Sequence, residues 1–212
     1  VTRNRPLPLS VRQQARVDLI LSVVASLLLL IPFCYIPAAF AVFIVRERTC
    51  KAKHLQMASG VSPWSYWASA FTFDYCQYVI LIVWAIAVFE MYGNAIFMSD
   101  ANSKAATVLL FFLYGLASLP LSYVYSFMFS NHSSAQIVIL SINFFTGFVM
   151  VMANFIMRSL PKTRAAANAL VYFYRFFPSY NFGEALINIA DTYYRQNILG
   201  RTWAKYWSWR VM

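Results

Sequence analysis

Long stretches without charged side chains alternate along the chain with short polar stretches that carry most of the charges. A helix needs about 20 mostly apolar residues to cross the hydrocarbon core of a bilayer, which is ~30 Å thick. Four stretches meet this length, so the pattern predicts membrane-spanning helices at about 18–45, 63–89, 105–129 and 135–157. We therefore predict an all-α integral membrane fold without a β-sheet.

Local signals mark bends and boundaries of these spans. Pro32 and Pro37 predict a bend in the first span, because proline removes a helical hydrogen bond. Ser62 and Pro63 form a typical N-cap and first-turn pair for the second span. The polar turn at 130–134 separates the third span from the fourth.

The chain after the fourth span has a different pattern. The stretches 165–177 and 182–190 are apolar, but each is too short to cross a bilayer. Short apolar pieces of this kind are typical of re-entrant or interfacial helices. We predict a re-entrant helical hairpin at about 165–191, in which Pro178 and Gly183 force the reversal of the chain.

The composition excludes an ordinary water-soluble domain. Hydrophobic residues make up 61% of the 212 residues and charged residues only 11%, against about 25% charged in typical soluble proteins. The net charge of +10 alone would suggest a nucleic-acid-binding protein. The Lys and Arg residues, however, stand at the ends of the apolar stretches, where they anchor helices to headgroups. We expect a multi-pass membrane protein that contacts membrane lipids and binds no nucleic acid.

Residue types used in catalysis are not arranged for it here. The glycines form no G-x-x-x-x-G-K-[ST] phosphate-binding loop. His54 and His132 have no carboxylate or cysteine at the spacing of a metal site, and Cys34, Cys50 and Cys76 form no C-x-x-C pair. We expect no catalytic residue, no metal site and no cofactor within this chain.

Asp74 is the one acidic residue well inside a predicted span. A charge at this depth is costly, so a functional role is the first hypothesis, with Gln77 and Tyr78 as neighbours on the same helix. The alternative is a structural hydrogen bond to a neighbouring helix. A proton-coupled carrier usually has several such ionisable groups, and both interpretations stay open.

A cluster of four cations and Glu47 lies between the first two predicted spans, at 46–53. Flanking cations by themselves indicate only anchoring of a span. Beyond them, His54, Met57 and Val61 share one face of a short helix, which we predict at about 50–61 along the membrane surface.

The order of residues in this region resembles the second transmembrane half of the A subfamily of ABC transporters. The matching motifs are Glu47-Arg48, Ala52-Lys53-His54-Leu55-Gln56, Ser59-Gly60-Val61, Tyr66-Trp67 and the later Asp74. The segment from Phe177 to Ile187 resembles the family's Phe-Pro-x-Phe-x-x-Gly-x-x-Leu-Ile motif, which precedes the final span. Glu184 stands where the family commonly has an Arg, which leaves the charge contacts at this position open.

The resemblance implies a polytopic ABC-2 domain of the type V exporter kind, with a cytoplasmic coupling helix and an exofacial re-entrant hairpin. It implies that 1–16 end an extracytoplasmic region, that 17–212 form a partial transmembrane domain, and that the final span and both nucleotide-binding domains lie outside this piece. The coupling-helix residues it implies are Glu47, Arg48, Lys51, Ala52, Lys53, His54, Leu55, Gln56, Ser59 and Gly60. The hairpin residues it implies are Phe177, Pro178, Gly183 and Glu184.

The function implied by the resemblance is that of the membrane half of an ATP-driven transporter of lipids or other amphipathic molecules. The full-length protein would be an ATP-hydrolysing translocase, with ATP and Mg²⁺ bound in the absent nucleotide-binding domains. Those domains and the other transmembrane half would be partners within the same polypeptide. Two alternatives remain, namely a secondary transporter or channel that uses Asp74, and a scaffold that transports nothing.

The distribution of charge and the resemblance predict opposite orientations. Only four of the 17 Lys and Arg residues lie at 46–62, so the positive-inside rule would place this loop outside the cytoplasm. The resemblance places it inside. The rule weakens beside large translocated domains, so we follow the resemblance.

Overall fold

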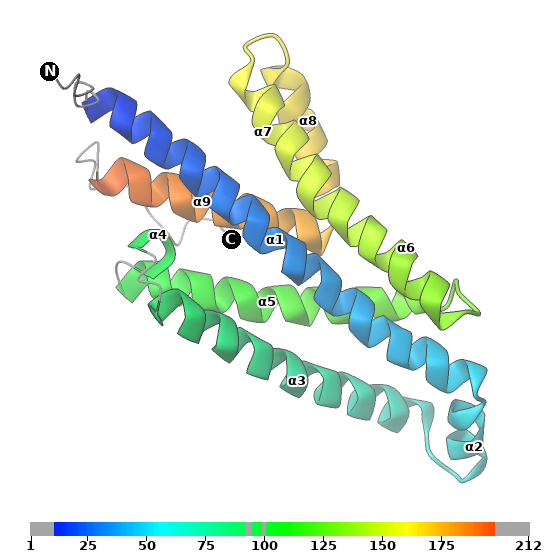
Figure 1. Ribbon diagram of the computed structural model, residues 1–212. Helices are drawn as coiled ribbons and strands as arrows, with labels where there is room; N and C mark the ends of the chain where they lie inside the picture. The colour runs from blue at the N-terminus through cyan, green and yellow to red at the C-terminus, as the bar shows by residue number, and fades with distance from the viewer. Residues whose placement is uncertain (1–10, 92–94, 99–100, 198–212) are drawn as a thin grey trace, which may run out of the picture.

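A computed structural model describes residues 11–91, 95–98 and 101–197, and every regular element in these ranges is a helix (Figure 1). Of the predicted extracytoplasmic segment 1–16, residues 1–10 lie outside the described residues and the others already belong to the first helix. The elements are α1 (Val11–Thr49), α2 (Ala52–Ala58), α3 (Pro63–Met91), α4 (Ala95–Met98), α5 (Ala101–Ser126), α6 (His132–Phe144), the π-helix η1 (Phe145–Val149), α7 (Met150–Ser159), α8 (Arg164–Tyr174) and α9 (Pro178–Asn197).

Four helical segments of the described chain are long and apolar enough to cross a membrane. They are Val23–Thr49, Pro63–Met91, Ala101–Ser126 and His132–Ser159. The prediction of an all-helical fold with four spans is therefore confirmed for the described residues. The third segment begins and ends a few residues earlier than the predicted 105–129.

The prolines do not divide the helices that contain them. Pro32 and Pro37 both lie inside the continuous helix α1, and Pro120 lies inside α5. The fourth span instead contains the irregular turn η1 between α6 and α7. A π-turn holds one residue more than an α-turn, and such turns often occur at functional positions.

An aromatic core joins α1, α5 and α9, each of which contacts the other two, and α1 crosses in front of α9 in Figure 1. The ring centroids of Phe33 and Phe111 are 4.9 Å apart, and those of Phe33 and Phe182 are 5.0 Å apart. Tyr114 stacks on Phe182 at 4.5 Å. All four rings are buried, so the helix α9 is packed into the centre of the molecule.

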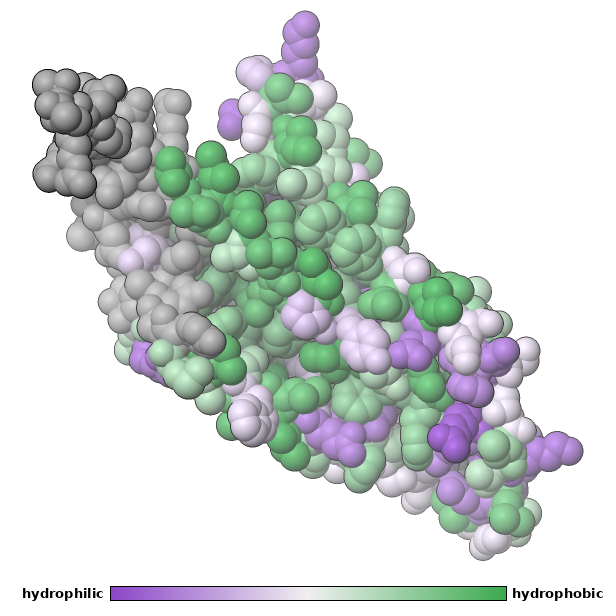
Figure 2. Space-filling model, viewed as in Figure 1, coloured by the Kyte–Doolittle hydropathy of each residue, from purple (hydrophilic) through white to green (hydrophobic). Residues whose placement is uncertain are grey.

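Figure 2 shows one face of the molecule, which is mainly apolar over α1 and its neighbours. α3 is the least buried of the four spans and exposes Ile80, Val83 and Trp84. Exposed apolar side chains are expected where a helix faces lipid.

The chain reverses between α8 and α9 at Arg175–Phe177, so the prediction that Gly183 takes part in the reversal is wrong. Pro178 is the first residue of α9, a position where the missing N–H of proline costs nothing. Gly183 lies inside α9, where an added Cβ would be 2.9 Å from Cγ2 of Val151. The glycine therefore permits close packing of α9 on α7. α9 also continues to Asn197, beyond the predicted end at 191.

Candidate functional site

The helix α2 stands apart at one end of the molecule, between α1 and α3 (Figure 1). It is shorter than the predicted 50–61, because Lys51 and Gly60 adopt left-handed backbone conformations, with φ of 58° and 95°, on either side of it. None of its residues is buried, and the side chain of Leu55 is 72% exposed. The side chains of α2 are therefore accessible on the surface of the molecule.

The other predicted residues of this segment follow the same pattern. His54, Gln56, Ser59 and Gly60 are exposed, whereas Ala52 and Lys53 are half-buried. The exposure leaves this segment accessible to a partner.

Lys53 attaches α2 to the beginning of α3. Its Nζ lies 4.2 Å from the ring centroid of Trp67 and 4.8 Å from that of Tyr66, which is cation–π geometry. Partial burial lowers the pKa of Lys53, the charge of Arg48 lowers it further, and the charge of Glu47 acts in the opposite direction. The ammonium group therefore exchanges part of its hydration for contact with aromatic rings.

The last turn of α1 joins α2 to two spans. Arg48 donates hydrogen bonds to the carbonyl oxygens of Ser126, at 2.8 Å, and Phe129. Carbonyl groups at the end of a helix lack partners within the helix, so a cation is favoured there. Glu47 accepts a hydrogen bond of 2.7 Å from the hydroxyl of Tyr66. The last turn of α1, which leads directly into α2, is therefore attached to both α3 and α5.

Several exposed apolar residues lie at the same end of the molecule, and the sequence did not single them out. Trp64 is 86% exposed and Met128 is 77% exposed. An open cleft of about 540 Å³ is lined by Arg48, Thr49 and 127–130. The predicted third span includes residues 127–129, so no sequence pattern indicates that they lie on an exposed end.

Asp74 is buried, and its hydrogen-bond partner is the hydroxyl of Tyr123 in α5. Tyr78 is also buried on this side of α3, where its hydroxyl donates to the carbonyl of Phe111 at 2.8 Å. Gln77 is exposed and is not brought together with them. Both buried side chains link α3 to α5, which agrees with the structural interpretation of Asp74.

Glu184 lies in α9 between two arginines. Its side chain is only 10% exposed, Nη2 of Arg158 is 3.3 Å from Oε1, and Nε of Arg175 is 3.4 Å from Oε2. A buried carboxylate needs such compensation, because leaving water is costly for an unpaired charge. Arg158 belongs to α7 and Arg175 to the turn before α9, so Glu184 joins three parts of the hairpin region.

The turn between α8 and α9 satisfies its own backbone groups. The amide of Asn181 donates to the carbonyl of Arg175 at 2.7 Å. The backbone N–H groups of Arg175, Phe176 and Phe177 donate to carbonyl groups of α8. Phe177 and Pro178 are half-buried beside this turn. The reversal therefore has internal hydrogen bonds in place of water.

No group of three or more His, Cys, Asp or Glu side chains that could hold a metal ion occurs in the described part of the chain. The predicted site residues instead make contacts between helices. The exposed short helix α2 follows α1 and contacts α3 through Lys53, and the last turn of α1 contacts α3 and α5. The helical hairpin at the other end is held by the carboxylate of Glu184.

Comparison with known proteins identifies related chains. The sequence profile of a family described as "ABC-2 family transporter protein" matches residues 2–209. The chain is 33% identical over 194 residues to the human "Phospholipid-transporting ATPase ABCA7", and the match covers 89% of this chain and 9% of that protein.

Two further relatives have similar sequence identity to the chain. The chain is 31% identical over 175 residues to "ATP-binding cassette sub-family A member 2" of Rattus norvegicus, with 81% of this chain and 7% of the relative covered. It is 29% identical over 196 residues to the bovine "Retinal-specific phospholipid-transporting ATPase ABCA4", with 88% and 8% covered. The chain thus spans less than a tenth of the length of each of these relatives.

Proposed function

Because the chain belongs to the ABC-2 family of transporter proteins, we propose that it forms the membrane half of an ATP-driven transporter of phospholipids or other amphipathic molecules. Two of the relatives described above are named as phospholipid-transporting ATPases, which supports this substrate class. The chain would act as part of a longer polypeptide with a second transmembrane half. ATP and Mg²⁺ would be bound by nucleotide-binding domains of that polypeptide.

The observation that carries the proposal is the combination of exposure and attachment at α2. Leu55 is exposed and available to a nucleotide-binding domain. Lys53 connects this helix to α3, and Glu47 and Arg48, in the last turn of α1 just before α2, connect that turn to α3 and α5. A helix that receives motion from a partner and transmits it to spans needs both properties. In this proposal α2 is the coupling helix and faces the cytoplasm.

The hairpin α8–α9 would dip into the opposite leaflet. Backbone groups at membrane depth need partners within the protein, and the turn at Arg175–Phe177 supplies them. A charged side chain at such depth also needs an opposite charge, and Glu184 provides it for Arg175. Both features support a re-entrant hairpin and not a surface loop.

Reconstitution of the full-length protein into liposomes tests the proposal. The wild-type protein should move a fluorescent phospholipid between leaflets in an ATP- and Mg²⁺-dependent manner. Leu55→Asp should retain ATP hydrolysis while the lipid moved per ATP falls about tenfold, since coupling between sites is typically worth 5–150-fold.

Ser134→Asp is the matched control, because it places the same charge on an exposed position at the start of α6, outside α2. This variant should keep the lipid-to-ATP ratio of the wild type. Equal effects of both variants would contradict the coupling role of Leu55. A wild-type protein that hydrolyses ATP without moving lipid would contradict the proposed substrate class.

A further inference from the structure

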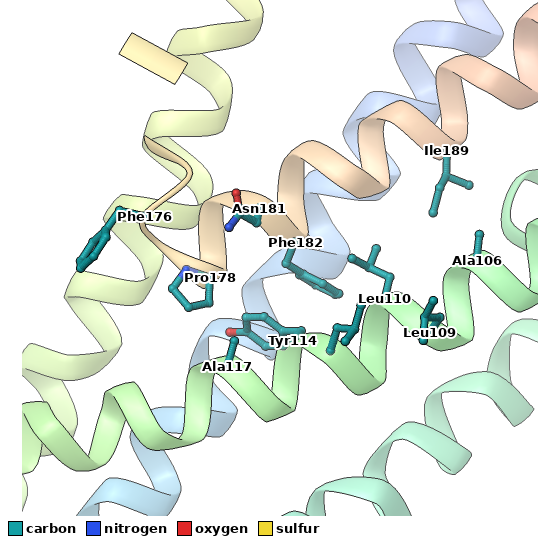
Figure 3. A pocket seen from close by; sticks show the side chains of 11 residues that line it. Ala106, Leu109, Leu110, Tyr114, Ala117, Phe176, Pro178, Asn181, Phe182 and Ile189 are labelled. Carbon is teal, nitrogen blue, oxygen red and sulfur yellow. The ribbon is translucent and has the colours of Figure 1, made fainter. Parts of the chain in front are cut away.

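A cavity of about 290 Å³ lies between α5 and α9, away from α2. Figure 3 shows Leu110, Tyr114 and Phe182 in its middle part. Ala106 and Ile189 lie toward one end, and Ala117 and Pro178 lie toward the other (Figure 3). The cavity therefore follows the two helices lengthwise.

The lining offers almost only apolar contacts. The two polar side chains in it are already engaged, since the Tyr114 hydroxyl donates to the Phe33 carbonyl at 2.9 Å and the Asn181 amide donates to the Arg175 carbonyl at 2.7 Å. An occupant therefore gains little from polar groups and much from methylene groups. This chemistry selects a hydrocarbon chain.

The dimensions of the cavity fit one such chain. Its lining extends over twelve residues on α5, from 106 to 117, and over the same number on α9, from 178 to 189, which is eleven helical steps on each. At 1.5 Å per residue each path is about 16 Å long. This is about half of the ~30 Å hydrocarbon core, the thickness that belongs to one leaflet. The volume lies at the lower end of the range for small-molecule sites, which favours a single chain over a whole lipid.

The cavity is accessible from the side of the helix bundle. Leu109, Leu113 and Phe176 line it and are 36%, 45% and 74% exposed. α5 is one of the four candidate spans, so the surroundings of Leu109 and Leu113 are the hydrocarbon region. A lipid in the bilayer can thus reach the cavity without leaving the membrane.

We propose that the cavity between α5 and α9 binds one acyl chain of a membrane phospholipid, which enters laterally between Leu113 and Phe176. The bound chain would fill space between the third span and the hairpin helix. This inference depends on the membrane location of the chain and not on transport or ATP hydrolysis.

Photolabelling of the full-length protein in phospholipid nanodiscs tests the site. The probe is phosphatidylcholine with a diazirine near the end of one acyl chain, and labelled residues are mapped by mass spectrometry. Label at 106–117 and 176–189 should exceed label on the exposed face of α3 around Ile80 and Val83, and it should persist after a detergent wash that removes bulk lipid.

Filling the cavity should displace the chain. Ala117→Trp should lower the label in the cavity about tenfold, because each lost methylene contact costs close to a factor of four. Leu116→Trp is the matched control, since Leu116 is 50% exposed, adjacent in sequence and outside the lining. Size-exclusion chromatography should give the same elution for both variants and the wild type.

Three results would overturn the inference. The first is equal labelling of the cavity in the Ala117→Trp and Leu116→Trp variants. The second is cavity labelling no greater than that of α3 after the wash. The third is a cross-link from a photoreactive amino acid at position 113 to another segment of polypeptide, which would mean that a protein helix occupies the cavity.

Discussion

The helix α2 follows the span α1 through a tight turn, and α9 follows the short helix α8 in the same way. Both have charged contacts, but their contacts with the rest of the molecule are opposite in kind. α2 buries none of its residues, whereas Phe182, Leu186 and Ile189 of α9 are almost completely buried. In α2 the cation Lys53 lies over the ring of Trp67, at the beginning of α3. In α9 the carboxylate of Glu184 lies between two arginines.

The difference indicates that partner binding and core packing belong to different helices of the chain. A helix whose side chains are free can bind a partner without disturbing the fold, because its contacts are not part of the core. A helix that supplies the core determines the position of its neighbours. Changes in α2 should therefore affect communication with partners, and changes in α9 should affect the fold itself.

The largest expected effect is a difference in thiol labelling between the end of the molecule with α2 and the end with the loop between α7 and α8. In a background without Cys34 and Cys76, Cys50 beside α2 should resist an impermeant thiol reagent on intact cells and react only after permeabilisation. A cysteine placed by Lys162→Cys in the exposed loop between α7 and α8 should react at once, because the proposed orientation puts it outside. Immediate reaction of Cys50, with a cytosolic control protein unlabelled, would reverse the orientation and remove the coupling role of α2.

The next contrast is in folding. Leu186→Ala removes a fully buried side chain from α9 and should lower the free energy of unfolding by about 2–5 kcal/mol. Leu55→Ala in α2 should change it by less than about 0.5 kcal/mol, because the side chain is exposed. Thermal stability of the purified full-length protein, followed by loss of the monodisperse chromatographic peak, measures both. Similar losses for the two variants would contradict the distinction between the helices.

A smaller effect is expected from the ion pairs. Glu184→Gln leaves two arginines without their shared carboxylate and should cost about 1–3 kcal/mol. Nζ of Lys104 and Oε1 of Glu90 form an exposed ion pair at 2.6 Å. Lys104→Gln breaks this pair and should cost less than about 1 kcal/mol of stability. The same thermal assay applies. A loss for Lys104→Gln that equals or exceeds the loss for Glu184→Gln would mean that burial does not strengthen the hairpin contact.

The spans could be predicted from the sequence because apolar length alone determines whether a helix can cross a bilayer. The start of α3 was predictable for a local reason, since the Ser62 side chain accepts a hydrogen bond from the N–H of Ser65 at the N-terminus. The end of α5 at Ser126 could not be predicted from local sequence. It coincides with hydrogen bonds from Arg48, which is 78 residues away in the chain.

The contacts of the charged residues could not be predicted either, because the partners lie far apart in the chain. The partner of Asp74 is Tyr123 on another helix, whereas sequence spacing indicates only neighbours on the same helix, such as Tyr78. Glu184 pairs with Arg158 across 26 positions. The resemblance directed attention to these residues, but the roles it implies for them stay predictions.

The π-turn at Phe145–Val149 has a consequence for the contact between α7 and α9. If this turn became α-helical, the residues after it would rotate by about 100° and shift by about 1.5 Å relative to α6. Arg158 and Val151 follow the turn, whereas Glu184 and Gly183 are held in α9. A change of one residue in helical register would therefore separate Arg158 from Glu184 and Val151 from Gly183 together.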